Sequence, residues 1–128
     1  MIVADASFLI GLADAEDVHH RAAVQLRAGL RGRTVLLHPL TLAECLVGPA
    51  RLDELQSAET SLRTATVVVE FDPTSPARFA LLRAQARLRL PDAIVLDTAI
   101  VHGAGIATFD ERLAASARTR GLEVLGTA

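Results

Sequence analysis

Short apolar segments alternate with longer segments of helical periodicity in this chain of 128 residues, and this alternation limits the possible folds most strongly. Five segments have the length and composition of buried strands. They are Ile2–Ala4, Thr34–His38, Thr66–Phe71, Gly105–Thr108 and Leu122–Leu125. Because helical segments separate them, we expect about five parallel strands in one central sheet that helices flank on both faces. The predicted class is therefore α/β, in a single domain over residues 1–128.

The segments between these strands carry helical spacing or helix-start signals. We expect helices over Ser7–Leu12, 17–30, Leu40–Val47, 51–63, the stretch from Pro76 to Leu90, 91–102 and Asp110–Arg118. Gly48 and Pro49 are expected to end the third of these helices. The segment after Pro91 is apolar on nearly every side until Gly103, so this helix is predicted to be central and buried.

Composition narrows the functional classes. Hydrophobic residues make up 51% of the chain, yet no apolar run approaches the ~20 residues that span a bilayer, so no membrane partner is expected. Cys45 is the only cysteine, which excludes an internal disulfide and favours a cytoplasmic location and a buried thiol. The chain contains no lysine, which excludes a P-loop and Schiff-base chemistry. The net charge of −2 gives no global sign of nucleic-acid binding, and it does not exclude it.

Four acidic residues lie in apolar sequence at predicted strand ends or within predicted helices. Asp5 and Asp110 follow strands, whereas Glu44 and Asp92 belong to helices. Burying a carboxylate is costly unless positive charge neutralises it. Sites in open parallel sheets form beyond the carboxyl ends of the strands, so the pattern permits all four acids to meet at one edge. A divalent cation with oxygen ligands would offset their repulsion, which predicts metal-dependent chemistry on a phosphate ester.

Each acid also has a structural interpretation, and the sequence leaves both open. Asp5 and Asp110 precede helices and could be N-caps, as could Ser7. Asp92 follows a proline at a helix start, where capping and the helix dipole both favour an acid. Glu44 lies within an apolar helix, where a solvated charge is less expected. The joint pattern of four acids is therefore more specific than any one of them.

Asp97 lies in the apolar run after Asp92 and is about 140° from it on a helical wheel, so the two do not share a face. It needs either a buried arginine or polar partner, or a place at the edge of the acidic site, and we favour the structural role. The four histidines lack zinc-motif spacing, and a structural role is expected for each. No G-x-S-x-G motif surrounds any serine, so serine hydrolase chemistry finds no support.

Taken together, four segments resemble those of PIN-domain ribonucleases, and most closely the small toxin subunits of bacterial VapBC toxin–antitoxin pairs. The segments are Ile2–Ile10 with Asp5 and Ser7, Leu40–Leu46 with Glu44, Leu90–Val95 with Asp92, and Ile106–Leu113 with Thr108 and Asp110. Each is short and weak alone. All four in order, over essentially the whole chain, are fairly specific.

The resemblance implies a compact PIN-like fold with a Mg²⁺ or Mn²⁺ site that hydrolyses RNA phosphodiester bonds. The catalytic and metal-binding residues implied by it are Asp5, Glu44, Asp92 and Asp110, with Ser7 and Thr108 in support. It also implies a small antitoxin protein that neutralises the enzyme, and a homodimer. One departure is Asp97, which stands where the family commonly has a small residue, usually alanine.

RNA contacts are predicted for Arg83, Arg87 and Arg112, because arginine binds phosphate bidentately. Arg83 and Arg87 are one helical turn apart, and Arg89 and Arg112 lie close in sequence to two of the acids. An arginine-rich helix face is often only solvated. With four phenylalanines and no tryptophan or tyrosine, recognition of RNA shape and backbone is favoured over base stacking. The alternatives are a catalytically silent PIN scaffold that binds proteins and an acid-rich phosphatase for small molecules.

Overall fold

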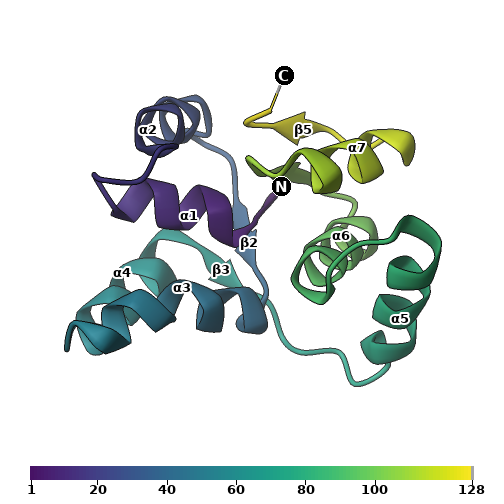
Figure 1. The fold of residues 1–128 in the computed structure, drawn as a ribbon, viewed down its shortest axis with the longest axis horizontal. Coiled ribbons are helices and arrows are strands. Elements are labelled where there is room, and N and C mark those ends of the chain that lie inside the picture. The colour runs from purple at the N-terminus through teal and green to yellow at the C-terminus, as the bar shows by residue number, and fades with distance from the viewer. Residues whose placement is uncertain (128) are drawn as a thin grey trace.

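A five-stranded parallel sheet forms the centre of the protein, whose computed structural model describes residues 1–127 (Figure 1). The strands are β1 (Ile2–Ala4), β2 (Val35–Leu37), β3 (Val67–Val68), β4 (Gly105–Ala107) and β5 (Val124–Leu125). They lie in the order β3-β2-β1-β4-β5, and every neighbouring pair is parallel. The α/β class and the five-stranded parallel sheet predicted from the alternation of segments are confirmed.

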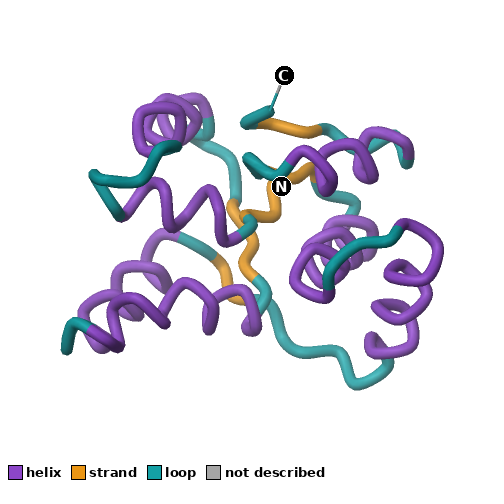
Figure 2. Tube along the Cα trace, in the orientation of Figure 1, coloured by secondary structure: helices purple, strands orange, loops and turns teal. Residues whose placement is uncertain are grey.

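Helices cover both faces of the sheet (Figure 2). Within residues 1–127 they are α1 (Ala6–Ala13), α2 (His20–Gly29), α3 (Pro39–Arg51), α4 (Leu55–Ala65), α5 (Ser75–Ala86), α6 (Leu90–His102) and α7 (Glu111–Thr119). Figure 1 shows α1 to α4 on one side of the strands and α5 to α7 on the other. This arrangement follows the order of the helices along the chain, because α1 to α4 come before β3 and α5 to α7 come after it.

The alternation of side chains along each strand divides the core into two clusters. In β1, Val3 packs in the cluster with α5, α6 and α7, whereas Ile2 and Ala4 pack in the cluster with α1, α2 and α3. Leu36 and Leu37 of β2 separate in the same way. Because the three residues of β1 are fully buried, this strand is the common wall of both clusters.

Helix α6 is as deeply buried as its sequence predicts. Its residues Asp92 to Ala99 are all buried, and α5, β1, β4 and α7 pack around it. The helix ends at Gly103, which has a φ of 61°, a left-handed conformation that glycine adopts at low cost.

The prediction that Gly48 and Pro49 end a helix is wrong, because α3 continues through both residues to Arg51. A proline within a helix removes one backbone donor and crowds the preceding turn. Pro49 lies in the last turn of α3, where the helix is about to end at its cap, Leu52, so only one internal bond is lost. Asp53 then adopts a φ of 61°, and α4 begins only at Leu55 rather than at residue 51.

The stripe of apolar residues from Phe79 to Leu90 does not belong to one helix as predicted. Helix α5 ends at Ala86, where Arg87 adopts a left-handed φ of 55°, and Leu90 begins α6 instead. The apolar spacing continues across this break because Leu82 and Leu88 both pack in the same core cluster. Helix α2 is also shorter than predicted, beginning at His20.

Within residues 1–127, none of the helices combines the length and apolar character needed to cross a membrane.

The buried Asp97 has the arginine partner that its apolar position requires, and this arginine, Arg78, is itself partly exposed. Arg78 of α5 donates from Nε to Asp97 Oδ1 at 2.9 Å and from Nη2 to Asp97 Oδ2 at 3.1 Å. The Nη2 atom also reaches Asp72 Oδ2 at 3.0 Å, and Arg78 Nη1 donates to the Thr74 hydroxyl at 3.1 Å. Hydrogen bonds from Thr74 and from Arg78 lower the pKa of Asp72 to about 2. Arg78 therefore ties the loop before α5 to α6, and Asp97 has a structural role.

The two partners of this ion pair should respond unequally to substitution. Arg78→Ala leaves the buried Asp97 carboxylate without a counter-charge and should lower the melting temperature more than Asp97→Ala, which leaves Arg78 in contact with Asp72 and water. The double variant should recover part of the loss caused by Arg78→Ala. Thermal unfolding of the four proteins measures this, with Arg63→Ala at an exposed pair as control. Additive effects of the two substitutions would contradict the assignment.

Candidate functional site

The carboxyl ends of β1 and β4 meet where the connectivity of the sheet reverses. From β1 the chain moves outward to β2 and β3, and it then returns to place β4 on the other side of β1. Open parallel sheets bind ligands at such a switch point, beyond the carboxyl ends of the strands. Asp5 directly follows β1, and Thr108 directly follows β4, so both residues lie at this position.

Asp5 connects the two strand ends through its carboxylate. Its Oδ1 accepts hydrogen bonds from the Ser7 hydroxyl at 2.6 Å and from the Phe8 backbone N–H at 3.1 Å, and its Oδ2 accepts from the Thr108 hydroxyl. The bond from Phe8 makes Asp5 the N-cap of α1. The capping interpretation of Asp5 is thus correct, and the same side chain also spans from β1 to the residue that follows β4.

Asp110 is held at the same place by the chain that follows Thr108. Its backbone N–H donates to Thr108 Oγ1 at 2.9 Å, while the N–H of Phe109 donates to Ser7 Oγ at 3.1 Å. Asp110 Oδ1 caps α7 by accepting from the Leu113 N–H at 2.9 Å. The two hydroxyl groups of Ser7 and Thr108 therefore fix the positions of Asp5 and Asp110 relative to each other.

Asp92 joins this group from the first turn of α6, where its side chain is buried. Arg89, the N-cap residue of α6, contacts two of the acids with one guanidinium. Its Nε lies 3.3 Å from Asp92 Oδ2, and its Nη2 lies 3.5 Å from Asp110 Oδ2. The start of α6 is thereby linked to the start of α7.

Glu44 approaches the group from α3 and remains exposed. Besides partial desolvation, the charges of Asp92 and Asp5 raise the pKa of Glu44 and the charge of Arg89 lowers it, so Glu44 lies within electrostatic range of these residues. Four separate segments of the chain thus place the four acids that the sequence singles out at the same edge of the sheet, within range of one another's charge.

Burial and mutual repulsion dominate the charge balance of this site. Burial raises the pKa of Asp5 more than its hydrogen bonds from Ser7, Thr108 and Phe8 lower it. Burial, and then the charge of Asp110, likewise raise the pKa of Asp92 against the opposing effect of Arg89. Glu44, although exposed, is partly desolvated by its neighbours, and this is the main cause of its raised pKa. Three of the four carboxylates are therefore less readily ionised than in water, as expected of acids that need a cation.

The donor set fits a hard divalent cation, since it consists of carboxylate oxygens with hydroxyl oxygens beside them. Nevertheless, in residues 1–127 no three acid, histidine or cysteine side chains converge closely enough to ligate one ion as they stand. Hydrogen bonds to Asp5 and the contacts of Arg89 with Asp92 and Asp110 also engage several of the oxygens that would be ligands. Cation binding would require these side chains, and Arg89 above all, to rearrange.

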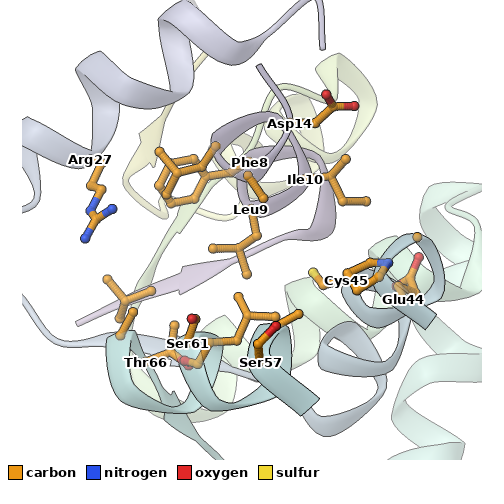
Figure 3. A pocket seen from close by; sticks show the side chains of 18 of the residues that line it. Phe8, Leu9, Ile10, Asp14, Arg27, Glu44, Cys45, Ser57, Ser61 and Thr66 are labelled. Carbon is orange, nitrogen blue, oxygen red and sulfur yellow. The ribbon is translucent and has the colours of Figure 1, made fainter. Parts of the chain in front are cut away.

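A large groove leads away from Glu44 between helices α1, α2, α3 and α4 (Figure 3). Its volume is about 1030 Å³, and apolar side chains such as Leu9, Leu12 and Leu62 line much of it. Glu44 and Cys45 lie together on the α3 side in Figure 3. Burial raises the pKa of the Cys45 thiol to about 12, which makes this cysteine an apolar wall of the groove and a poor nucleophile.

A family model for the PIN domain matches residues 2–127 of the chain. The chain belongs to the PIN-domain family. The resemblance proposed from the four acidic segments is therefore confirmed, and the all-parallel sheet with helices on both faces agrees with it.

Solved structures similar to this PIN domain include toxin–antitoxin proteins. A toxin–antitoxin complex from Klebsiella pneumoniae matches with a TM-score of 0.73 and 25% identity, covering 86% of this chain and 87% of that one. VapC20 of Mycobacterium tuberculosis, a toxin that cleaves the sarcin–ricin loop, matches with a TM-score of 0.71 and 25% identity over 91% and 95%. PAE2754 from Pyrobaculum aerophilum, at 22% identity and a TM-score of 0.61 over 89% and 77%, shares the fold. A sequence search of curated proteins finds no match.

The arginines chosen from the sequence for RNA contacts lie in different settings in this PIN domain. Arg83 donates from Nε to the Leu88 carbonyl at 3.2 Å and so supports the turn between α5 and α6. Arg87 is exposed in that turn, and Arg112 is exposed in the first turn of α7. Arg89, which the sequence places near Asp92 but which was not among the predicted RNA contacts, is the arginine in contact with the acids. Its position three residues before Asp92, at a helix start, was the available signal.

The raised pKa of Glu44 predicts how the stability of this PIN domain depends on pH. Because Glu44 binds its proton more tightly in the folded protein, the ionised side chain lowers the unfolding free energy at neutral pH. In chelator, Glu44→Gln should therefore be more stable than the wild type at pH 7. The gain should shrink as the pH falls through the raised pKa, and vanish below the ordinary value of 4.5, where both states are protonated.

Urea unfolding across this pH range measures the effect, with Glu16→Gln at an exposed position as control. A Glu44→Gln variant that is less stable than the wild type at pH 7 would contradict the placement of Glu44 among the other acids.

Thr108→Val should destabilise the protein although the two side chains have nearly the same shape. The substitution removes a donor to Asp5 and an acceptor for the Asp110 N–H, and it leaves buried polar groups without partners. We expect a loss of about 1–3 kcal/mol in unfolding free energy. Chemical denaturation measures it, and Thr119→Val, at an exposed hydroxyl of α7, is the matched control. Equal effects of the two substitutions would show that the hydroxyl of Thr108 does not fix this site.

Proposed function

We propose that this PIN domain is a metal-dependent endoribonuclease toxin that hydrolyses RNA phosphodiester bonds and is neutralised by a cognate antitoxin. The observation that carries the proposal is the meeting of Asp5, Glu44, Asp92 and Asp110 at the switch point between β1 and β4. Membership of the PIN-domain family and the toxin–antitoxin proteins among the structural neighbours support the same class of activity.

In this proposal the four carboxylates hold Mg²⁺ or Mn²⁺, which when bound activates water and neutralises charge on the scissile phosphate. The protein contributes a rigid frame for these acids. Ser7 and Thr108 orient Asp5, and Thr108 also fixes the backbone of Asp110. Asp92 is held by the buried helix α6, whereas the exposed Glu44 can adapt its position. Three rigid acids and one adjustable one suit a site that must accept a bulky substrate.

RNA is the proposed substrate, and its backbone is the feature most easily recognised here. VapC20 cleaves the sarcin–ricin loop, a structured RNA. The exposed Arg87 and Arg112, together with Arg83, remain candidates for phosphate contacts near the acids. The chain has four phenylalanines and no other large aromatic residue, so shape and backbone recognition are favoured over stacking on aromatic side chains.

The groove between α1 and α4 is the proposed site for the antitoxin. Its apolar lining suits the apolar face of a peptide segment, and Arg27, Arg31 and Arg33 line it beside these apolar groups. Glu44 also lines the groove, so a segment bound there would reach the acids. The solved toxin–antitoxin complex from Klebsiella pneumoniae supports a protein partner of this kind.

We further propose a single-domain protein that acts as a homodimer in the cytoplasm. Exposed apolar side chains on α5 and α6, namely Leu81, Ile100 and Val101, offer surface that a second copy could cover. A cytoplasmic location follows from an RNA substrate and from the single, buried Cys45.

A catalytically silent scaffold is the second candidate. The observation in its favour is that Arg89 already neutralises part of the acidic charge, and that no metal-ligating group forms within residues 1–127. Such a protein would bind a partner in the groove and cleave nothing.

Cleavage assays separate these candidates. With Mn²⁺, the protein should cleave at least one of a panel of structured RNAs that includes a sarcin–ricin loop oligonucleotide. Chelator should abolish the activity, and Asp5→Asn should lower it by about 100-fold or more, since even residues that only support metal ligands cost 10- to 100-fold. Asp53→Asn is the matched control, because asparagine tolerates the left-handed φ of this exposed position. Cleavage that survives both chelator and Asp5→Asn would reject the mechanism, and binding without cleavage would favour the scaffold.

A further inference from the structure

Arg89 is the only basic side chain that forms an ion pair with any of the four acids in the part of the chain that the structure describes. It contacts the Oδ2 atoms of Asp92 and Asp110 together, from the residue immediately before α6. The attraction also extends to Glu44, because the charges of Asp92, Asp110 and Glu44 all raise the pKa of Arg89. A single guanidinium thus lies among acids that come from three helices.

The ion pairs of Arg89 with Asp92 and Asp110 are weak, so Arg89 can readily exchange them for contacts with other groups. Its side chain is 70% exposed, and its two N–O distances of 3.3 and 3.5 Å are long for charge-assisted hydrogen bonds. Exposed ion pairs with long side chains contribute little net stability, because water screens them and their ordering costs entropy. By contrast, Arg78 contacts the buried Asp97 through two bonds of 2.9 and 3.1 Å. The ion pair at the buried Asp97 is therefore held tightly, whereas the ion pairs of Arg89 at the candidate site are held loosely.

The oxygens that Arg89 contacts are those a cation would need. Asp110 Oδ1 is already occupied as the cap of α7, which leaves Oδ2 as the oxygen available for ligation, and this is the atom that Arg89 contacts. Asp5 has both oxygens engaged by donors. A divalent cation bound between Asp92 and Asp110 would therefore compete with the guanidinium of Arg89 for these two oxygens.

We propose that Arg89 is an internal counter-cation that competes with the metal for Asp92 and Asp110 and, once displaced, binds a phosphate oxygen of the RNA. This inference rests on the proposed function and adds a positioning residue to it. The guanidinium suits both roles, since carboxylate and phosphate present the same pair of oxygens to its planar N–H groups. Arg89 need only rotate about its exposed side chain, because its backbone is fixed at the start of α6. Binding of metal and of substrate are then coupled through one side chain.

Substitution of Arg89 should strengthen metal binding and weaken RNA binding, and measuring both affinities tests this coupling. Arg89→Gln should bind Mn²⁺ several-fold more tightly than the wild type in calorimetric titrations at fixed ionic strength, because the competitor is gone. At saturating Mn²⁺ the same variant should show a higher KM for RNA. Arg89→Lys retains the charge and should bind Mn²⁺ as the wild type does, but it should raise KM because a lysine cannot bind phosphate bidentately. Arg51→Gln, an exposed arginine at the far end of α3, is the control for a loss of one positive charge.

Nitrogen NMR of the Arg89 side chain gives a readout that does not depend on activity. The Nε–H signal, assigned by its loss in Arg89→Lys, should shift as Mg²⁺ is added to the wild type and should saturate together with metal binding. An unchanged signal at saturating Mg²⁺, or an Arg89→Gln variant that binds Mn²⁺ no more tightly than the wild type, would overturn the inference. If those results accompany metal-dependent RNA cleavage by the wild type, the proposed function stands and only the role of Arg89 fails. A wild type that neither binds Mn²⁺ nor cleaves RNA refutes both.

Discussion

Burial of negative charge at the meeting point of β1 and β4 is the constraint on which the rest of the site depends. A carboxylate removed from water must be compensated by donors, by a counter-charge or by protonation. This protein supplies backbone donors at two helix starts, where Asp5 caps α1 and Asp110 caps α7, and Asp92 lies in the first turn of α6 beside Arg89. Helix N-termini favour negative charge, so the sheet topology that brings three of them together also makes the acidic cluster tolerable.

Asp97 and the acids of the candidate site show how the same side chain type serves two purposes. The carboxylate of Asp97 is buried and fully paired with Arg78, so it holds the loop before α5 onto α6 and has no capacity for a ligand. In contrast, burial raises the pKa of Asp92 despite the nearby Arg89, which shows that its compensation is incomplete. Incomplete compensation costs stability, and it is the condition under which a cation can bind with a gain in free energy.

Sequence patterns predicted the sheet and singled out the four acids, because both depend on local order along the chain. Short aliphatic segments between helices lead to a parallel sheet, and acids that follow strands reach its carboxyl edge. The patterns failed where the outcome depends on packing between distant segments. Pro49 continues a helix because it falls in the last turn, and the apolar stripe after Phe79 passes from α5 to α6 because both helices contribute to one core cluster. Arg78, the partner of Asp97, lies 19 residues away along the chain. The sequence showed that Asp97 needed a polar partner, but it could not identify which residue this was.

The capping and catalytic interpretations of the acids, which stood as alternatives in the sequence, are compatible in three dimensions. A carboxylate has two oxygens, and Asp110 uses Oδ1 to cap α7 while Oδ2 faces Arg89. Because capping fixes Oδ1 of Asp110, it also fixes the direction of Oδ2, which is the oxygen that a ligand could reach. Asp5 goes further, because its two oxygens join a helix start to the adjacent strand end through Phe8 and Thr108. Its raised pKa shows that three donors do not offset its burial. The remaining charge can be offset by a proton or by a cation, so capping acids gathered at a switch point leave room for a ligand that isolated, solvated caps do not.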